Sequence, residues 1–325
     1  MREKALPVMR YLPNASRLIY GCMGLGGGWN RDAIGPEHVH QARACVDAAL
    51  ESGINLFDHA DIYAQGKAEQ VFGEVLKQCP GLRENIYLQS KSGIRFADDA
   101  GPKRYDLSKG WILQSVDGIL QRLGTEYLDL LMLHRPDPLM APEAIAEAFE
   151  LLLESGKVRN FGVSNMHAHQ MQLLVGSLGR PLVANQLELS LHHRQWLEEG
   201  VFAGHPDARR VGFSPGTLDY CRTQGVQLQA WGSLCRGLYS GSVTPEHPLS
   251  VRRTAALVMD LALQYQVSKE AVVLAWLMRH PAQIQPIIGT TDLERIRACA
   301  VAPSVELGRA QWYSLYVAAR GEELP

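Results

Sequence analysis

Short apolar runs of strand length alternate along the chain with longer segments whose apolar residues recur at helical spacing. A clear example is Ile54–Phe57, a buried-strand pattern that follows a helical pattern over Pro36–Ser52. Gly53 stands between the two, which is a usual place for a residue just beyond a helix end. The alternation therefore predicts successive β–α units in which the strands pair in parallel.

The same rhythm continues to the end of the chain. The predicted strands are Leu18–Cys22, Ile54–Phe57, Ile86–Gln89, Leu128–Leu133, Val158–Val163, Leu182–Leu187, Val226–Trp231 and Gln285–Ile288. The predicted helices are Pro36–Ser52, Lys67–Gln78, Ser108–Leu123, Pro142–Ser155, Ala168–Leu178, Thr217–Gln224, Val251–Tyr265, Ser268–Arg279, Leu293–Ala300 and Leu307–Ala319. Eight such units in 325 residues predict an α/β fold, a (β/α)8 TIM barrel with extra helices that forms a single domain over residues 1–325. A doubly wound open sheet with a second domain is the alternative.

Two segments depart from the alternation. Residues 8–20 hold two apolar pieces around Pro13-Asn14, a pair that favours a turn, so an N-terminal β-hairpin is expected there. Ser190–Gly216 is long and polar and interrupts the rhythm. We interpret it as an insertion whose histidines lie in solvent, and we expect no metal site because their spacing to other ligands is not a usual one.

Composition narrows the class of protein. The hydrophobic fraction is 46%, the charged fraction 20% and the net charge −2, which are typical of a soluble globular protein and do not favour nucleic-acid binding. No stretch approaches the roughly 18 consecutive apolar residues of a membrane helix, and the first residues show no signal peptide. Six Cys without a C-x-x-C pair are too sparse for a disulfide framework, so we expect reduced thiols in a cytoplasmic protein.

Residues able to carry chemistry fall at the C-terminal ends of the predicted strands, where barrel enzymes place their active sites. Asp58 and Tyr63 follow the second strand, Lys91 the third and His134 the fourth. A Lys⁺ within hydrogen-bond reach should lower the pKa of a Tyr, an Asp should hold that Lys charged, and a His should position a carbonyl. Together they predict a general acid for carbonyl reduction, and the hydride must come from a cofactor because no side chain supplies one.

At this point the chain resembles the aldo-keto reductases. The resemblance runs through six blocks in order over nearly the whole length: FDHADIY, QSKSG, LLMLHRPDP, GVSN, ANQLELS and IIGTTDLERIR. It implies a (β/α)8 barrel that uses NAD(P)H to reduce a small aldehyde or ketone. It also implies Tyr63 as proton donor, Lys91 and Asp58 as the residues that tune it, and His134 as the residue that positions the substrate.

The resemblance further implies a site for NADPH, with NADH as the alternative cofactor. Ser164, Asn165 and Gln186 would bind the nicotinamide amide, and the ring of Trp231 would stack under the nicotinamide. The remaining residues implied to line the cofactor are Met23 and Gly24 in the glycine-rich first loop, Gly232, Ser233, Leu234 and Arg236 along the pyrophosphate, and Thr290, Thr291 and Arg295 near the adenosine ribose and its 2′-phosphate.

The sequence differs from the commonest pattern of that family in several places. His59 stands where many members carry Thr, and Ala64-Gln65 follows Tyr63 where a Gly is common. Trp231 replaces a frequent Tyr and can still stack. Gly289 stands where many members place a phosphate-binding Lys, so a preference for NADPH depends mainly on Arg295.

Each residue also has a plain structural explanation. Asp58 could serve as a turn residue, Gln186 as a hydrogen-bonded core amide, and Arg295 as part of a solvated charged helix face. The joint occurrence of Asp58, Tyr63, Lys91 and His134 at matching strand ends is what favours a site. Two other functions stay open: a cofactor-binding sensor or accessory subunit with vestigial activity, and a lyase that uses Lys91 as a Schiff-base nucleophile. The expected partner is a small carbonyl compound, and the expected state is a monomer without nucleic-acid or membrane partners.

Overall fold

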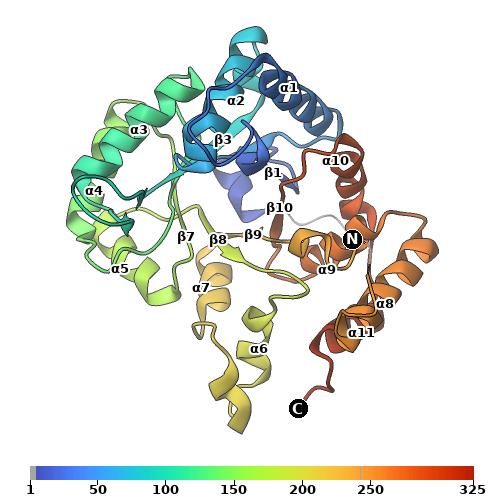
Figure 1. Ribbon diagram of the computed structural model, residues 1–325. Helices are drawn as coiled ribbons and strands as arrows, with labels where there is room; N and C mark the ends of the chain where they lie inside the picture. Colours follow the sequence, from blue (N-terminus) through green and yellow to red (C-terminus); the bar gives the residue numbers. More distant parts are fainter. Residues whose placement is uncertain (1–4, 242) are drawn as a thin grey trace.

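The computed structural model describes residues 5–241 and 243–325, and its centre is a closed barrel of eight parallel strands (Figure 1). The barrel strands are β1 (Ile19–Gly21), β2 (Leu56–Asp58), β3 (Tyr87–Ser92), β6 (Leu130–Leu133), β7 (Phe161–Ser164), β8 (Ala184–Glu188), β9 (Gln227–Trp231) and β10 (Gln285–Ile288). They follow the order β1-β10-β9-β8-β7-β6-β3-β2 around the barrel. The predicted (β/α)8 barrel is therefore confirmed, and the open doubly wound sheet is wrong.

Helices surround the barrel on its outer face (Figure 1). They are α1 (Pro36–Glu51), α2 (Lys67–Gln78), α3 (Lys109–Leu123), α4 (Pro142–Glu154), α5 (Ala168–Leu178), α6 (Gln195–Val201), α7 (Thr217–Gln224), α8 (Leu249–Tyr265), α9 (Lys269–Met278), α10 (Leu293–Ala300) and α11 (Arg309–Arg320). Apolar residues on their inner faces and on the outward faces of the strands form one continuous buried cluster. The predicted helices are all present, with ends that shift by a few residues.

The register of the strands sets which residues share the C-terminal rim. Gly21 pairs with Asp58, Asp58 with Gln89, and Ser164 with Gln186. Because the strands are parallel and closed into a ring, their C-terminal ends meet at one mouth. Side chains alternate between the inside and the outside of the barrel along each strand, so residues two apart point into the same space.

The N-terminal segment closes the opposite end of the barrel. Residues Pro7–Arg10 form a short 3-10 helix, and the expected hairpin over residues 8–20 is wrong. Pro7 suits the first position of a helical turn, and Val8 and Leu12 are buried against the apolar strand residues at the bottom of the barrel, Leu130 among them. Burial of these side chains favours a compact turn over an exposed two-stranded ribbon.

The segment between β8 and α7 is ordered against the outside of the barrel. It contains α6 and a 3-10 helix at Pro206–Arg210. Trp196 of α6 is 1% exposed and packs its edge on Trp276 of α9, with ring centroids 6.0 Å apart. Glu198 pairs with Arg320 of α11 at 3.2 Å. The polar insertion expected over Ser190–Gly216 is therefore held against the barrel helices by the buried Trp196. Its mostly polar composition gave no sign of this contact.

A small β-hairpin also lies at the mouth of the barrel. Strands β4 (Ile94–Arg95) and β5 (Arg104–Tyr105) pair in antiparallel fashion after β3. Arg95 is bonded to Asp106 at 2.9 Å and to Asp98 at 2.8 Å, and these ion pairs hold the turn. The predicted pattern contained no signal for this hairpin, because each of its strands is only two residues long.

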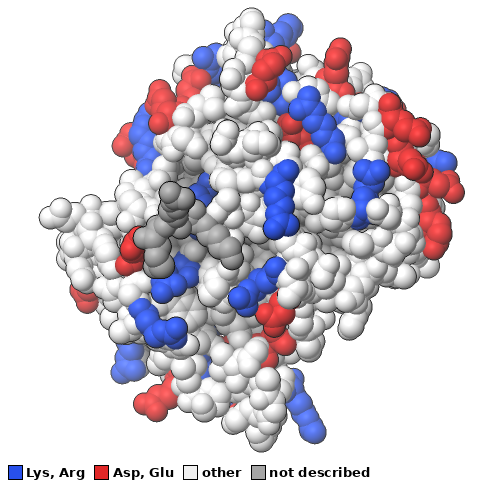
Figure 2. Space-filling view, turned by 180° about the vertical axis from the view of Figure 1, so that it is seen from behind, with Lys and Arg blue, Asp and Glu red and all other residues white. Residues whose placement is uncertain are grey.

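On the face opposite to the one seen in Figure 1, Lys and Arg side chains stand singly among uncharged residues, and Asp and Glu lie mostly near the edges (Figure 2).

Within the described part of the chain, no helix has the length and apolar character that crossing a membrane requires.

Replacing Leu12 by Ala should destabilise the protein. Leu12 is 1% exposed in the apolar cluster that closes the barrel, and a buried Leu→Ala change costs about 2–5 kcal/mol because a cavity remains. Urea unfolding followed by circular dichroism measures the loss. Leu173→Ala is the matched control, since Leu173 is 55% exposed on α5 and should change the free energy of unfolding by less than about 0.5 kcal/mol. Equal effects of the two substitutions would contradict this packing.

Candidate active site

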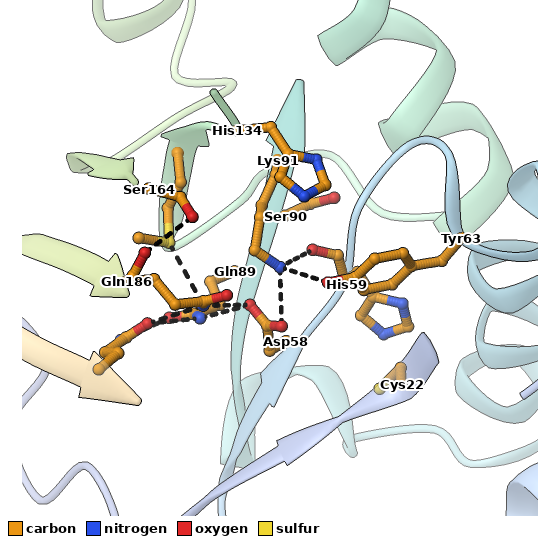
Figure 3. A network of polar contacts seen from close by, with 12 residues as sticks. Cys22, Asp58, His59, Tyr63, Gln89, Ser90, Lys91, His134, Ser164 and Gln186 are labelled. Atoms are coloured by element: carbon orange, nitrogen blue, oxygen red, sulfur yellow. Dashed lines mark hydrogen bonds and ion pairs between the residues drawn. The ribbon is translucent and has the colours of Figure 1, made fainter. Parts of the chain in front are cut away.

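Lys91 is the centre of a buried polar network at the mouth of the barrel (Figure 3). Its side chain is 0% exposed, and its Nζ donates to Asp58 Oδ2 at 2.7 Å, to the His59 carbonyl oxygen at 2.9 Å and to Tyr63 Oη at 2.9 Å. These bonds use all the protons of an ammonium group. Burial opposes the charge of Lys91, but Asp58 and Tyr63 more than compensate and raise its pKa above the ordinary value. The ammonium is therefore charged and fixed in direction.

Asp58 is held from below by a layer of glutamines inside the barrel. Its Oδ1 accepts from Gln89 Nε2 at 2.6 Å and from Gln186 Nε2 at 3.0 Å. Gln89 and Gln229 exchange amide bonds at 2.9 Å, and Gln186 also donates to Gln229 Oε1 at 3.1 Å. Because both carboxylate oxygens are bonded, the hydrogen bonds lost with water are replaced although Asp58 is only 2% exposed.

Tyr63 approaches Lys91 from the loop that leaves β2. It opens a short 3-10 segment, Tyr63–Gly66, in which Ala64, Gln65 and Gly66 all have positive φ. Left-handed backbone is uncommon for residues other than Gly, so this turn is strained where the phenol is positioned. Burial raises the pKa of Tyr63, and Lys91 only partly offsets that rise. Lys91 lowers the pKa of Tyr63 as expected, but removal of the phenolate from water outweighs this attraction, so the net pKa of Tyr63 in the protein alone is raised.

His134 follows β6 and faces Tyr63 across the mouth. The two rings meet edge to face with centroids 6.1 Å apart. Burial, together with the positive charges of Lys91 and Arg135, lowers the pKa of His134 to about 2. The imidazole is consequently neutral at physiological pH, and its buried Nδ1 has no protein partner among the described residues.

A second set of predicted residues is connected at the ends of β7 and β9. Trp231 Nε1 donates to Asn165 Oδ1 at 3.1 Å, and Asn165 Nδ2 donates to Ser164 Oγ at 2.8 Å and to the His134 carbonyl at 3.3 Å. Asn165 has a φ of 59°, a conformation that Asn tolerates better than most residues. These bonds orient the Trp231 ring at the rim. Gln186, predicted beside them, lies deeper and directs its amide nitrogen to Asp58 and Gln229.

The remaining predicted residues lie around the rim without contacting Lys91. Met23 and Gly24 form a short turn after β1, and Met23 is 52% exposed. Gly232 to Leu234 and Arg236 follow β9, and Ser233 directs its hydroxyl inward, to the Ile287 carbonyl at 2.7 Å. Thr290 and Thr291 follow β10. Arg295 of α10 is half exposed, with its Nε 3.7 Å from Glu270 Oε1.

The layers that support the site are not among the residues expected from the sequence. Gln89 and Gln229 precede Lys91 and Trp231 by two positions, so the alternation of side chains along a strand was a usable signal for them. On the outer side of β3, Ser90 donates to Glu69 at 2.7 Å, and Arg122 of α3 pairs with Glu69 at 2.8 Å. No short-range pattern links these three residues, because they belong to three different elements.

His59 is an unusual buried residue beside the site. Its side chain is 0% exposed, its ring packs edge-on against Phe72 at 4.7 Å, and neither ring nitrogen has a partner among the described residues. Burial and the nearby Lys91 lower its pKa to about 3. His59 is therefore neutral in the folded protein, whereas its carbonyl oxygen serves Lys91.

Comparison with known sequences gives matches over nearly the whole chain. The model of the aldo/keto reductase family matches residues 17–315. The oxidoreductase YcsN of Bacillus subtilis is 37% identical and the alignment covers 95% of this chain and 96% of that protein. The 6-dehydroglucose reductase of Agrobacterium fabrum is also 37% identical, with coverage of 95% and 96%.

Solved structures show the same fold. The glycerol dehydrogenase of Gluconobacter oxydans superposes with a TM-score of 0.79 at 21% identity, covering 95% of this chain and 92% of that one. An aldo/keto reductase of Klebsiella pneumoniae, solved in complex with NADP and acetate, has a TM-score of 0.70 at 22% identity, with coverage of 93% and 90%. At these identities the likeness concerns the barrel.

Replacing His59 by Thr should reduce the amount by which the free energy of unfolding falls when the pH is lowered. The folded protein keeps His59 neutral down to about pH 3, whereas the unfolded chain binds a proton below about pH 6.5. The free energy of unfolding therefore falls as the pH is lowered through this window. His59 alone should account for about 2 kcal/mol of that fall between pH 7 and pH 5. Urea unfolding at both pH values measures the difference. His169→Thr, at an exposed position of α5, is the control, and an unchanged pH dependence in His59→Thr would refute this account.

Proposed function

We propose, on the basis that the chain belongs to the aldo/keto reductase family, that it is an NADPH-dependent reductase of a small aldehyde or ketone with Tyr63 as the proton donor. The observation that supports this most is the contact of Tyr63 with the buried Lys91, which is paired with Asp58. NADPH, when bound, supplies the hydride that reaches the carbonyl carbon.

Proton transfer falls to Tyr63. Lys91 donates to Tyr63 Oη, so it occupies a lone pair of that oxygen and leaves the phenolic hydrogen free to point at a substrate oxygen. The raised pKa keeps this hydrogen in place at neutral pH. As the proton leaves, negative charge grows on an oxygen 2.9 Å from an ammonium group whose position does not have to change, which is the condition for electrostatic stabilisation of a transition state.

His134 would place the substrate. A neutral imidazole carries one ring N–H, and the edge-to-face arrangement puts it beside the Tyr63 ring, where a carbonyl oxygen could accept from both groups. A charged imidazolium at this point would face the unfavourable field of Lys91. The low pKa of His134 therefore suits a donor that binds the oxygen and leaves the proton transfer to Tyr63.

The residues at the ends of β7 and β9 fit a nicotinamide group. The Asn165 bond to Trp231 Nε1 fixes the plane of the indole, and a fixed aromatic plane at the mouth suits stacking with a flat ring. Asn165 bonds the indole directly, and Ser164 bonds Asn165 in turn. Since the Gln186 amide nitrogen is bonded to Asp58, we propose for Gln186 mainly the orientation of that carboxylate.

The other two functions are less well supported. A Schiff-base lyase needs a neutral lysine with a free lone pair, whereas Lys91 is protonated and donates to three oxygens. A sensor with vestigial activity has no need of a complete set of Asp58, Tyr63, Lys91 and His134 around one mouth. Among the relatives, two are named 6-dehydroglucose reductase, so oxidised sugars belong among the first substrates to test.

Replacing Tyr63 by Phe should reduce kcat for aldehyde reduction by about a hundredfold or more, because general acid catalysis contributes about that much. Affinity for NADPH, measured by fluorescence titration, should change by less than threefold. Tyr105→Phe removes a phenol that is 42% exposed on β5 and is the matched control. If Tyr63→Phe keeps normal turnover, the proposed proton donor is wrong.

Replacing Arg295 by Met should weaken NADPH binding by roughly tenfold, the loss of about 1.4 kcal/mol, and leave NADH binding unchanged. Only NADPH carries the 2′-phosphate that we propose Arg295 contacts. Fluorescence titration with each cofactor measures both constants. Arg297→Met, on the same helix but paired with Glu51 and Glu294, is the control. Equal weakening of both cofactors would assign Arg295 a structural role instead.

A further inference from the structure

A cavity of about 460 Å³ lies between the rim of the barrel and the segment of residues 190–216. Asn165 and Trp231 line it from the ends of β7 and β9, and Trp196 and Phe213 line it from that segment. Figure 1 shows α6 and α7 following β8 outward on this side of the barrel. The wall that the segment provides is therefore continuous with the residues proposed to contact the nicotinamide.

The cavity contains one strong hydrogen-bond donor that lacks a carboxylate partner. Arg135 follows His134 directly, and its guanidinium lies 5.8 Å from the centroid of the Trp231 ring. In residues 5–241 and 243–325, no carboxylate oxygen lies within 4.0 Å of it. The Arg135 guanidinium carries N–H donors and lines the cavity, so it can donate to a ligand bound there.

The same cavity contains an acceptor that is only weakly engaged. Glu188, the last residue of β8, has its Oε1 3.4 Å from His193 Nε2, a contact that becomes an ion pair only when the imidazole is protonated. Glu188 is 39% exposed at its side chain, so its carboxylate faces the cavity and the solvent. Donor and acceptor groups are thereby combined with the aromatic ring of Phe213.

We propose that this cavity binds the body of a neutral, polyhydroxylated carbonyl substrate, with Arg135 and Glu188 as the residues that determine specificity. This inference rests on the proposed reductase function. A hydroxyl group both donates and accepts, so neighbouring hydroxyls can satisfy Glu188 and Arg135 together. The C–H faces of such a molecule pack on the aromatic walls.

Two other classes of substrate fit less well. A carboxylate on the substrate would gain Arg135 but would be repelled by Glu188 in the same cavity. An alkyl chain would remove both charged groups from water without replacing their hydrogen bonds, which is unfavourable. The cavity should consequently distinguish substrates of equal length by the groups that they carry.

Three aldehydes of four carbons test this discrimination: D-erythrose, succinic semialdehyde and butanal. With NADPH, kcat/KM for D-erythrose should exceed each of the other values by at least roughly tenfold, because a site that hydrogen-bonds hydroxyls discriminates strongly against analogues without them. A kcat/KM for butanal or succinic semialdehyde equal to that for D-erythrose would overturn the proposal.

Two single substitutions locate the discrimination. Arg135→Met and Glu188→Gln should each lower the ratio of kcat/KM for D-erythrose to that for butanal by roughly tenfold, mainly through KM. Glu188→Gln should also raise the relative kcat/KM for succinic semialdehyde, since it removes the repulsion. Arg209→Met, which changes an exposed arginine of the same segment outside the cavity, is the control and should keep the wild-type ratio. Wild-type ratios in both cavity variants would overturn the proposal.

A binding experiment separates this inference from the proposed function. Erythritol and 1-butanol are added to the protein saturated with NADP⁺, and quenching of tryptophan fluorescence reports binding near Trp196 and Trp231. Erythritol should bind at least tenfold more tightly than 1-butanol, and Arg135→Met should abolish the difference. If that holds while no aldehyde is reduced, the cavity is correct and the reductase function is wrong. If the two alcohols bind alike, the cavity inference is wrong whatever the turnover.

Discussion

The ion pair between Lys91 and Asp58 is the interaction on which the mouth of the barrel depends. Two charges without access to water are unfavourable unless they are paired and hydrogen-bonded, and here Lys91 donates three bonds and both carboxylate oxygens of Asp58 accept. The cost of burial is offset by the Gln89–Gln186–Gln229 layer on one side and by the His59 carbonyl and Tyr63 on the other. Removing one partner would leave the other charge stranded, so the pair and its surrounding layer act as one unit.

This buried charge also contributes to the states of the neighbouring side chains. Burial is the main reason that the pKa values of His134 and His59 are low, and the ammonium group lowers them further because a second positive charge nearby is unfavourable. It also limits the rise in the pKa of Tyr63 that burial causes. Burial and one fixed cation together thus influence which groups at the mouth carry protons, and the parallel register of the strands decides which residues lie close to that cation.

The sequence was sufficient to predict the barrel and the identity of the residues around Lys91. Strand ends are visible as apolar runs, and the parallel barrel rule carries Asp58 and Lys91 to the same mouth although 33 positions separate them. The sequence was insufficient to predict local structure or pKa values that depend on contacts between distant parts of the chain. The turn at Pro7–Arg10 depends on the open bottom of the barrel, α6 depends on Trp276, and the pKa of Tyr63 depends on its burial. None of these is encoded in a local pattern.

Because α6 is anchored outside the barrel, the segment of residues 190–216 can change in sequence more freely than the barrel strands. Trp196 and the Glu198–Arg320 pair fasten the segment to α9 and α11, and none of these contacts passes through a barrel strand. Changes in the length or side chains of this segment would therefore reshape one wall of the cavity while the register that aligns Asp58 with Lys91 stays as it is. Substitutions in this peripheral segment can in this way change the substrates that the protein accepts while the residues around Lys91 stay the same.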